Sequence, residues 1–399
     1  MITNVSSALS VDRLQRTLGE ICSLGPRWQG SEGERKILSY LEDVLLRRIG
    51  IGCKKEAFEY LGFNAHMADL VLEGSPPTKI NCQPLAYSAM ESVTGELIYI
   101  SGENLGERND ADGKIVLTDA LKSYQTYPQA VRGGAAGFVF GNRLKENLIR
   151  AGVTNYEGCL GSIPAVAIGS ADTQLLMERV REKPRVRMEV RAESKWQRSE
   201  NLVVSVEGDR RNPRILVCSH YDSMGLGPHA FDNASGTAAT LELIEVFKES
   251  PYPLSFLLCG AEELGFWGSK AFVRQHLEEC KRLGAVVCLD GISSDLGSVE
   301  IGVTESLAPR IRRLAEREAF GVDQWSIPPR PSSDHTGFEA LGVPVFWLTT
   351  MDPYYHTAAD VPEHVSKERL TRHTTFAAHV ITSLAGSSSP GGAEGDLCG

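Results

Sequence analysis

Residues 214–222 read RILVCSHYD, an apolar run that ends in the polar side chains of His220 and Asp222. The same pattern returns in LSFLLCGAEE over residues 254–263 and in AVVCLD over residues 285–290. Short apolar runs with polar ends are typical of buried strands, and a stretch with helical periodicity follows each of them. Strands and helices that alternate in this way build a mainly parallel sheet covered on both faces. The sequence therefore predicts a three-layer α/β fold.

The remaining predicted elements extend this pattern in both directions. A fourth strand of the sheet is predicted at residues 343–348, and a helix over residues 31–49 begins with the capping-box pair Ser31 and Glu34. Two separate strands are predicted at residues 54–60 and 66–72. Further helices are predicted at residues 236–249, 266–282, 306–319 and 367–384.

The pattern of residue types changes between residues 85 and 171, where short β-branched runs are separated by glycine-rich or polar turns. This indicates a small β-rich domain inserted into the larger one. We therefore predict a discontinuous main domain over residues 1–84 and 172–386 and an insert over residues 85–171. A tail over residues 387–399, rich in Ser, Gly and Pro, is predicted to be disordered.

Composition excludes several classes of function. The net charge of −10 over 399 residues gives no support to a nucleic-acid partner. No apolar run approaches the roughly 20 residues of a membrane-spanning helix, and the N-terminus shows no signal-peptide pattern. The nine cysteines are scattered and form no CxxC motif, which favours free thiols and a cytoplasmic location. The oligomeric state stays open, with a homo-oligomer as one option.

Five side chains that can bind a metal follow the ends of the predicted strands. They are His220, Asp232, Glu263, Asp290 and His356. Ligands of open α/β sheets bind outside the carboxyl ends of the strands, so we expect these groups to converge at one edge. Taken singly, each has a plainer explanation, because HxD and Glu-Glu pairs are common on surfaces and an Asp before a helix can be a cap. Their conjunction at the ends of apolar strands, where an unpaired carboxylate is costly, favours a site.

This donor set suits Zn²⁺, which accepts nitrogen and oxygen ligands in small coordination shells. Charge favours two ions, because three carboxylates and one bridging hydroxide neutralise two Zn²⁺ ions, whereas one ion would leave the carboxylates in excess. Glu262, next to a ligand without being one, is then free to act as a general base.

The motifs and their order resemble peptidase family M28, a family of zinc aminopeptidases, and imply its zinc exopeptidase fold. The resemblance rests on His220-x-Asp222, Asp232-Asn233-Ala234-Ser235-Gly236, Glu262-Glu263, Asp290 and Tyr355-His356-Thr357-x-x-Asp360, together with Ser333-Asp334-His335 and Gly25-Pro26-Arg27. Within residues 85–171, Gly113-Lys114-Ile115-Val116-Leu117 and Ile163-Pro164-Ala165-Val166 resemble a protease-associated (PA) domain. Such inserts are frequent in this family.

The resemblance also implies a role for each site residue. His220 and Asp290 would hold one zinc, Glu263 and His356 the other, and Asp232 would bridge both. Glu262 would be the general base, Asp222 would orient His220, and Tyr355 would help to polarise the scissile carbonyl of a peptide substrate. The family also carries a cis peptide bond after the bridging carboxylate, here Asp232-Asn233.

Other activities on the same scaffold remain open. Glutaminyl cyclases keep similar residues and use one zinc, but they lack a PA-like insert and place tryptophan where this chain has Tyr355. A non-enzymatic binding protein, such as the transferrin receptors, would be expected to have lost ligands. Carboxypeptidases and dipeptidases share the metal site, and a carboxylate receptor for them would have to come from residues such as Arg310, Arg313 and Arg330.

Overall fold

The predicted parallel strands lie at the centre of one mixed sheet in the computed structural model, which describes residues 5–105, 110–144 and 146–386. Across the larger unit of the molecule, the strand order is β13-β12-β14-β11-β9-β10-β8. The four central strands β14, β11, β9 and β10 run parallel, and β12 and β8 flank them antiparallel. Their bounds are β8 (Arg185–Val206), β9 (Ile215–His220), β10 (Leu254–Cys259), β11 (Ala285–Leu289), β12 (Ser298–Val303), β13 (Gln324–Ser326) and β14 (Val345–Met351).

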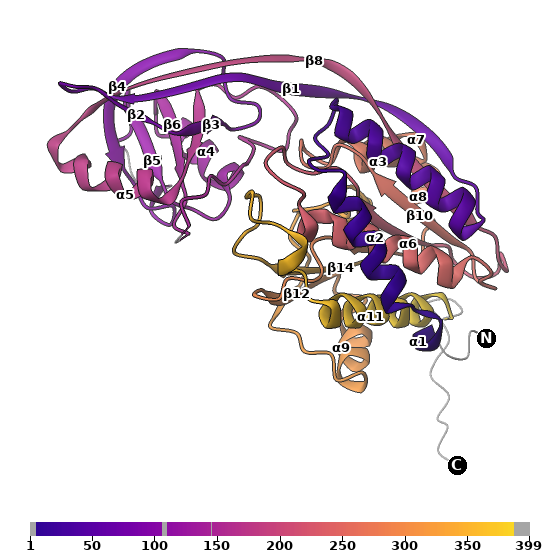
Figure 1. Ribbon diagram of the computed structural model, residues 1–399. Helices are drawn as coiled ribbons and strands as arrows, with labels where there is room; N and C mark the ends of the chain where they lie inside the picture. Colours follow the sequence, from indigo (N-terminus) through magenta and orange to yellow (C-terminus); the bar gives the residue numbers. More distant parts are fainter. Residues whose placement is uncertain (1–4, 106–109, 145, 387–399) are drawn as a thin grey trace.

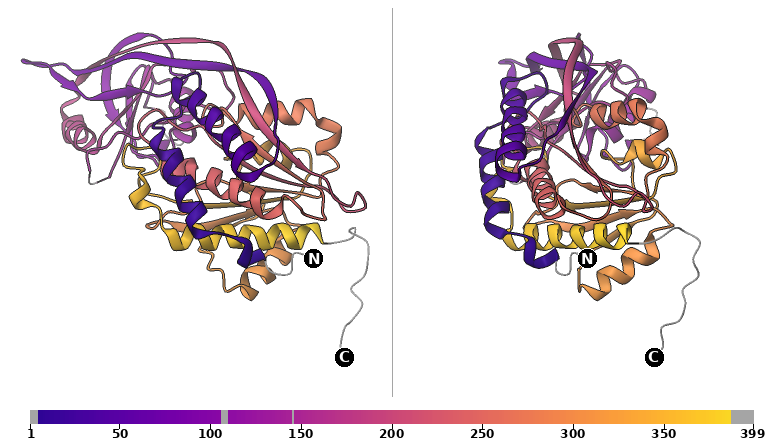
Figure 2. Two further views of the ribbon diagram at one scale, coloured as in Figure 1. Left: turned by 45° about the vertical axis from the view of Figure 1, so that its right-hand side comes forward. Right: turned by 90° about the vertical axis from the view of Figure 1, so that its right-hand side faces the viewer.

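Helices cover both faces of this sheet, which confirms the predicted three-layer α/β class (Figure 2). Alternate side chains of a strand enter opposite cores, so Val217 packs in one and its neighbours Leu216 and Cys218 in the other. The first core is covered by α2 (Val11–Ser23), α3 (Glu32–Asp43), α6 (Gly236–Phe247), α9 (Ala308–Arg317) and α11 (Lys367–Ala385). The second is covered by α7 (Trp267–Gln275), α8 (Leu277–Cys280) and α10 (Thr336–Glu339). The short helix α1 (Val5–Ala8) precedes α2.

Two long strands carry the chain from this larger unit to a smaller one (Figure 1). Residues 54–60 and 66–72, predicted as separate strands, are both part of β1 (Lys54–Leu72), which pairs antiparallel with β8 along its whole length. A bulge between Ala65 and Met67 lets β1 continue where the alternation of polar and apolar residues breaks. The prediction of two separate strands was therefore wrong.

The smaller unit is a sheet covered by two helices. Its strands follow the order β4-β5-β6-β7-β3, and β4 pairs with the outer part of β8. The bounds are β2 (Thr78–Ile80), β3 (Cys82–Pro84), β4 (Ser92–Tyr99), β5 (Ile115–Thr118), α4 (Ser123–Arg132), β6 (Gly137–Gly141), β7 (Ala165–Ile168) and α5 (Ser170–Arg179). The strand β3 lies in this sheet, and Ile80 and Leu176 lie in the core of the unit, so the sheet and core extend beyond both predicted edges of the insert. The range 85–171 stays a prediction, and the tail 387–399 lies outside the described residues.

Several smaller elements differ from the prediction. The helix expected over residues 31–49 becomes α3 followed by a wider turn at Val44–Ile49, and the helix expected over 266–282 is divided at His276 into α7 and α8. The helix α2 and the strand β12 were not predicted at all.

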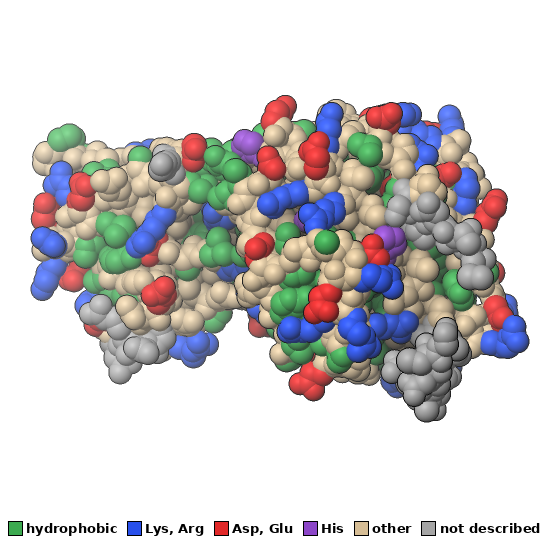
Figure 3. Space-filling view, turned by 90° about the horizontal axis from the view of Figure 1, so that it is seen from below, with side chains coloured by type: hydrophobic (Ala, Val, Ile, Leu, Met, Phe, Trp, Pro, Cys, Tyr) green, Lys and Arg blue, Asp and Glu red, His purple; other side chains and the backbone are tan. Residues whose placement is uncertain are grey.

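Charge and cysteine chemistry agree with the sequence. Lys, Arg, Asp and Glu side chains are spread over both units on the face shown in Figure 3. All eight cysteines in the described ranges are free, as predicted. Among the helices described here, none has the length and apolar character that a membrane crossing requires.

Candidate active site

The five predicted metal ligands meet at the carboxyl edge of the central strands. His220 is the last residue of β9, Asp290 directly follows β11, and Glu263 lies in the loop after β10. Asp232 lies in the turn Ala230–Ser235 before α6, and His356 lies in the loop after β14. All are buried except Asp290, whose side chain is 14% exposed. The parallel topology brings these residues together, because parallel strands present their carboxyl ends on one side.

The ligand atoms form two clusters that share Asp232. In the first cluster, His220 Nε2 lies 3.1 Å from Asp232 Oδ1 and 3.2 Å from Asp290 Oδ1. In the second, His356 Nε2 lies 3.2 Å from Asp232 Oδ2 and 2.9 Å from Glu263 Oε2. Each oxygen of Asp232 thus faces a different histidine, as a carboxylate that bridges two cations would.

The donors in both clusters fit a pair of divalent cations. Asp232 Oδ1 and His356 Nε2 are buried without a hydrogen-bond partner, which is costly unless a cation takes that place. Burial would lower the pKa of His220, but Glu262 and the neighbouring aspartates raise that pKa well above its usual value. Burial likewise opposes the protonation of His356, yet Glu263 and Asp232 raise its pKa to about 9. The carboxylates therefore favour positive charge where the ring nitrogens point, and nitrogen with oxygen is the donor set of zinc.

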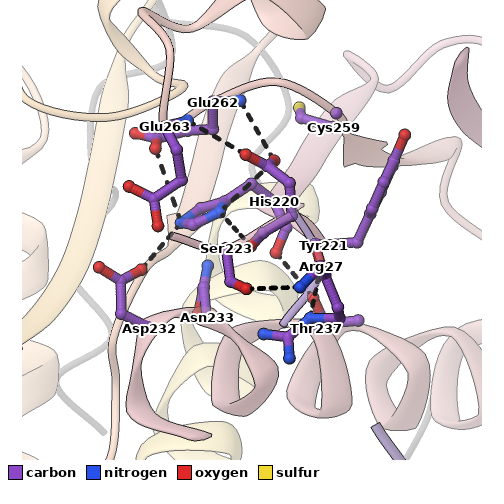
Figure 4. Close-up of polar contacts among 12 residues, drawn as sticks. Arg27, His220, Tyr221, Ser223, Asp232, Asn233, Thr237, Cys259, Glu262 and Glu263 are labelled. Atoms are coloured by element: carbon purple, nitrogen blue, oxygen red, sulfur yellow. Dashed lines mark hydrogen bonds and ion pairs between the residues drawn. The ribbon is translucent and has the colours of Figure 1, made fainter. Parts of the chain in front are cut away.

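Asp222 holds the loop that carries the glutamates. Its two carboxylate oxygens accept the backbone N–H groups of Glu262 and Glu263, each at 3.1 Å, and Figure 4 labels these two glutamates. Asp222 also accepts a hydrogen bond from the Gln29 amide. His220 Nδ1 lies 3.2 Å from the backbone oxygen of Asp222 and 3.7 Å from its carboxylate. The nearest acceptor for the His220 N–H is thus the backbone carbonyl of Asp222, rather than its side chain.

Asp360 plays the corresponding part for Asp232. Its carboxylate, 1% exposed, accepts the backbone N–H groups of Phe231 at 2.7 Å and Asp232 at 3.0 Å. The peptide bond Asp232-Asn233 is cis, as the family resemblance implies. The side chain of Asn233 accepts from Gly236 N and Gly291 N and so ties this turn to the end of β11.

Glu262 and Tyr355 complete the centre. Glu262 Oε2 lies 3.9 Å from His220 Nε2, and burial raises the pKa of this carboxyl well above its usual value. The ring of Tyr355 stacks on that of His356 with centroids 3.6 Å apart. A small pocket beside Asp232 and Asp290 is lined in part by Tyr355 and by Lys122 of the smaller unit.

Two arginines near the clusters donate to backbone carbonyls of the surrounding loops, and the sequence did not predict these contacts. Arg27 is fully buried and donates to the backbone oxygens of Tyr221, Pro228 and His229, so it links the loops before Asp222 and before Asp232. The motif Gly25-Pro26-Arg27 pointed to it, without indicating what it contacts. Arg150 donates to the backbone oxygens of Pro353 and Tyr355, and no sequence motif pointed to it.

The other candidate residues lie outside the two clusters. His335 is buried, its Nε2 lies 2.9 Å from the backbone oxygen of Arg330, and burial lowers its pKa to about 4. His229 is buried near Asp360, with 3.7 Å between Nδ1 and Oδ2. Of the arginines considered as a carboxylate receptor, Arg330 pairs with Glu300 and Arg310 donates to Ser383.

A buried cluster of histidines and carboxylates at this edge of an α/β sheet is typical of a metal-dependent enzyme. Residues 201–381, which lie in the larger unit, match the model of Peptidase family M28, a family of metallopeptidases. It is 29% identical to Aminopeptidase YwaD of Bacillus subtilis, over 87% of this chain and 79% of that protein.

Solved structures resemble the fold over nearly the whole chain. The aminopeptidase from Aneurinibacillus sp. strain AM-1 has a TM-score of 0.73 at 25% identity and covers 96% of both chains. BSAP, a zinc aminopeptidase from Bacillus subtilis, has a TM-score of 0.71 at 25% identity and covers 94% of this chain and 95% of its own.

Proposed function

We propose that this chain is a zinc aminopeptidase that uses two zinc ions and removes N-terminal residues from peptides. The observation that carries the proposal is the shared carboxylate, because the two oxygens of Asp232 face His220 and His356 at 3.1 and 3.2 Å. His220, Asp232 and Asp290 would hold one ion, and Asp232, Glu263 and His356 the other. The names of the aminopeptidase relatives support the same activity.

When bound, the two zinc ions would supply Lewis acidity toward the scissile carbonyl and lower the pKa of a water molecule. Glu262 accepts the proton of the attacking water and returns it to the leaving amine. Its position fits this task, because Asp222 fixes the Glu262 backbone while no hydrogen bond in the described structure engages the Glu262 carboxylate. The Tyr355 hydroxyl donates to the carbonyl oxygen as negative charge develops there.

The charges around the centre favour attack at the amino end of the peptide. Glu262 lies beside the clusters without being a ligand, and its carboxylate can receive a substrate ammonium group, whereas Arg310 and Arg330 already have partners in the structure. A carboxypeptidase would instead need a free cation positioned for the terminal carboxylate.

A substrate panel combined with metal counting tests the proposal. The purified protein is loaded with zinc, its metal content is measured, and cleavage of Leu-Ala-Ala is compared with its N-acetylated and C-amidated forms. We expect two zinc ions per chain, loss of cleavage on N-acetylation, and retention on C-amidation. Loss on C-amidation alone would indicate a carboxypeptidase, and loss on both a dipeptidase-like enzyme.

The same preparation tests the cyclase alternative. One zinc per chain, together with ammonia release from a glutaminyl peptide, would refute the proposal and identify a glutaminyl cyclase. Asp232→Asn serves as the ligand variant and should lower the zinc content, whereas Asp323→Asn, at an exposed position outside both clusters, should leave it unchanged.

A further inference from the structure

The smaller unit reaches into the active site at residues 150 and 151, between β6 and β7. Arg150 is 5% exposed, although it belongs to a connecting segment. Its Nη1 donates to the backbone oxygen of Tyr355 and its Nη2 to that of Pro353, each at 2.8 Å. The next residue, Ala151, donates its backbone N–H to the backbone oxygen of His356, also at 2.8 Å.

These three bonds reach three carbonyls in one turn of the chain, over residues 353–356. A guanidinium group can hold two carbonyls at a fixed separation because its donors lie in one rigid plane. Among the described residues, no carboxylate forms an ion pair with Arg150. Its polar contacts are thus directed at the backbone of this loop rather than at a charge partner.

The loop needs such support because its backbone is unusual. His356 adopts φ +59, in the left-handed region that residues other than glycine rarely occupy. Conformations of this kind cost on the order of 1–3 kcal/mol and persist where surrounding contacts fix them. Within the larger unit, the loop has short-range bonds such as Thr357 N to Tyr354 O at 2.9 Å. The bonds from residues 150 and 151 add anchors from a separate part of the fold.

A second contact from the smaller unit reaches the ring of Tyr355. Lys122 Nζ lies 5.9 Å from the centroid of the Tyr355 ring and 5.7 Å from that of Tyr124, in cation–π geometry. Lys122 and Tyr124 both belong to the smaller unit. The side chain of Tyr355, whose ring stacks on His356, therefore contacts the smaller unit in addition to the bond that its backbone accepts from Arg150.

We infer that Arg150 is a positioning residue that, with the Ala151 amide, holds Tyr355 and His356 in place and makes the smaller unit a working part of the active site. The inference rests on the proposed function, since His356 belongs to the second metal cluster. The smaller unit then governs zinc affinity in the Glu263–His356 cluster and turnover, beyond any role in substrate access.

The test compares Arg150→Met and Arg150→Lys with the matched control Arg132→Met. Arg132 is an exposed arginine of the same unit at the end of α4. Three quantities are measured on the full chain: amide hydrogen exchange of residues 354–357 in metal-free protein, the affinity of each zinc by chelator competition, and kcat and KM on a peptide substrate.

For Arg150→Met we expect faster exchange in the loop and a loss of about 10- to 100-fold in the affinity of one zinc, as for other residues that support a ligand. The other zinc should bind as before, and kcat should fall with little change in KM. Arg150→Lys should be intermediate, because one ammonium cannot hold both carbonyls in the same geometry. Arg132→Met should match wild type in all three.

Wild-type loop exchange and wild-type zinc affinities in Arg150→Met would overturn the inference. If this variant does not fold, Arg150→Lys decides, and wild-type values there would overturn it equally. Failure of the proposed function is recognised separately, because wild-type protein would then bind no zinc pair, while loop exchange in metal-free protein still reports on the role of Arg150.

Discussion

Replacing Asp360 with asparagine tests how the bridging carboxylate is held. Asp360 accepts the backbone N–H groups of Phe231 and Asp232, one with each oxygen, and is almost fully buried. In Asp360→Asn only one oxygen remains, so in either orientation of the amide one buried backbone N–H faces another donor. An unsatisfied buried N–H costs about 1–3 kcal/mol, and the remaining bond loses its ionic character. We expect a loss of about 2–3 kcal/mol in the free energy of unfolding.

The assay is urea denaturation of metal-free protein, followed by zinc titration of the folded variant. Because the turn that carries Asp232 loses one of its two bonds to residue 360, zinc affinity should also fall by about 10- to 100-fold. The control is Asp323→Asn, because Asp323 is exposed and accepts a single backbone N–H, from Val299, which an asparagine oxygen can still accept. This control should stay within about 0.5 kcal/mol of wild type. An Asp360→Asn protein that unfolds like the control and binds zinc like wild type would refute the reasoning.

Three further predictions address chemistry and pH. Glu262→Gln should keep its zinc but lose about 10²- to 10⁴-fold in kcat, and near-normal turnover would remove Glu262 from the role of base. Tyr355→Phe should lower kcat by about 10²-fold with little change in KM, and an unchanged kcat in steady-state assays would argue against a hydroxyl contact with the carbonyl oxygen. Burial lowers the pKa of His373 to about 4, so the unfolded chain takes up this proton first as pH falls. The contribution of His373 to the free energy of unfolding should be fully present above about pH 6.5. It should decrease by about 3 kcal/mol as the pH falls toward 4. In denaturation at several pH values, His373→Asn should flatten that decline whereas the exposed-site control His66→Asn should not, and equal slopes in both would contradict the assignment.

The sequence was most informative where local chemistry and topology coincide. The apolar runs ending at His220, Glu263 and Asp290 predicted both the central strands and the edge where the side chains meet, because parallel strands must present these ends together. The family resemblance then supplied the pairing of ligands, and the structure brings the same residues into two clusters.

What the sequence left out depends on contacts between distant segments. The register of β1 with β8 continues through a bulge, which local periodicity reads as a break between two strands. Asp360 belongs to a motif that gave no indication of its partners, and Arg150 belongs to none. Both act on backbone groups more than a hundred residues away, and backbone partners leave no pattern in side-chain identity. Helix α2 went unpredicted although its buried face, with Leu14 and Leu18, follows helical spacing.

The pairing of β1 with β8 also has a consequence for how this architecture can be altered. Gly62 lies opposite Lys195 in the register, so the chain departs for the smaller unit and returns from it at adjacent points. A unit with neighbouring entry and exit can be exchanged as a cassette, by splicing a homologous segment at these two positions. Such a chimera would keep the larger-unit part of the β1–β8 pair intact. It would be an active enzyme only if the donor segment supplied its own hydrogen-bond donor to the carbonyls of Pro353 and Tyr355.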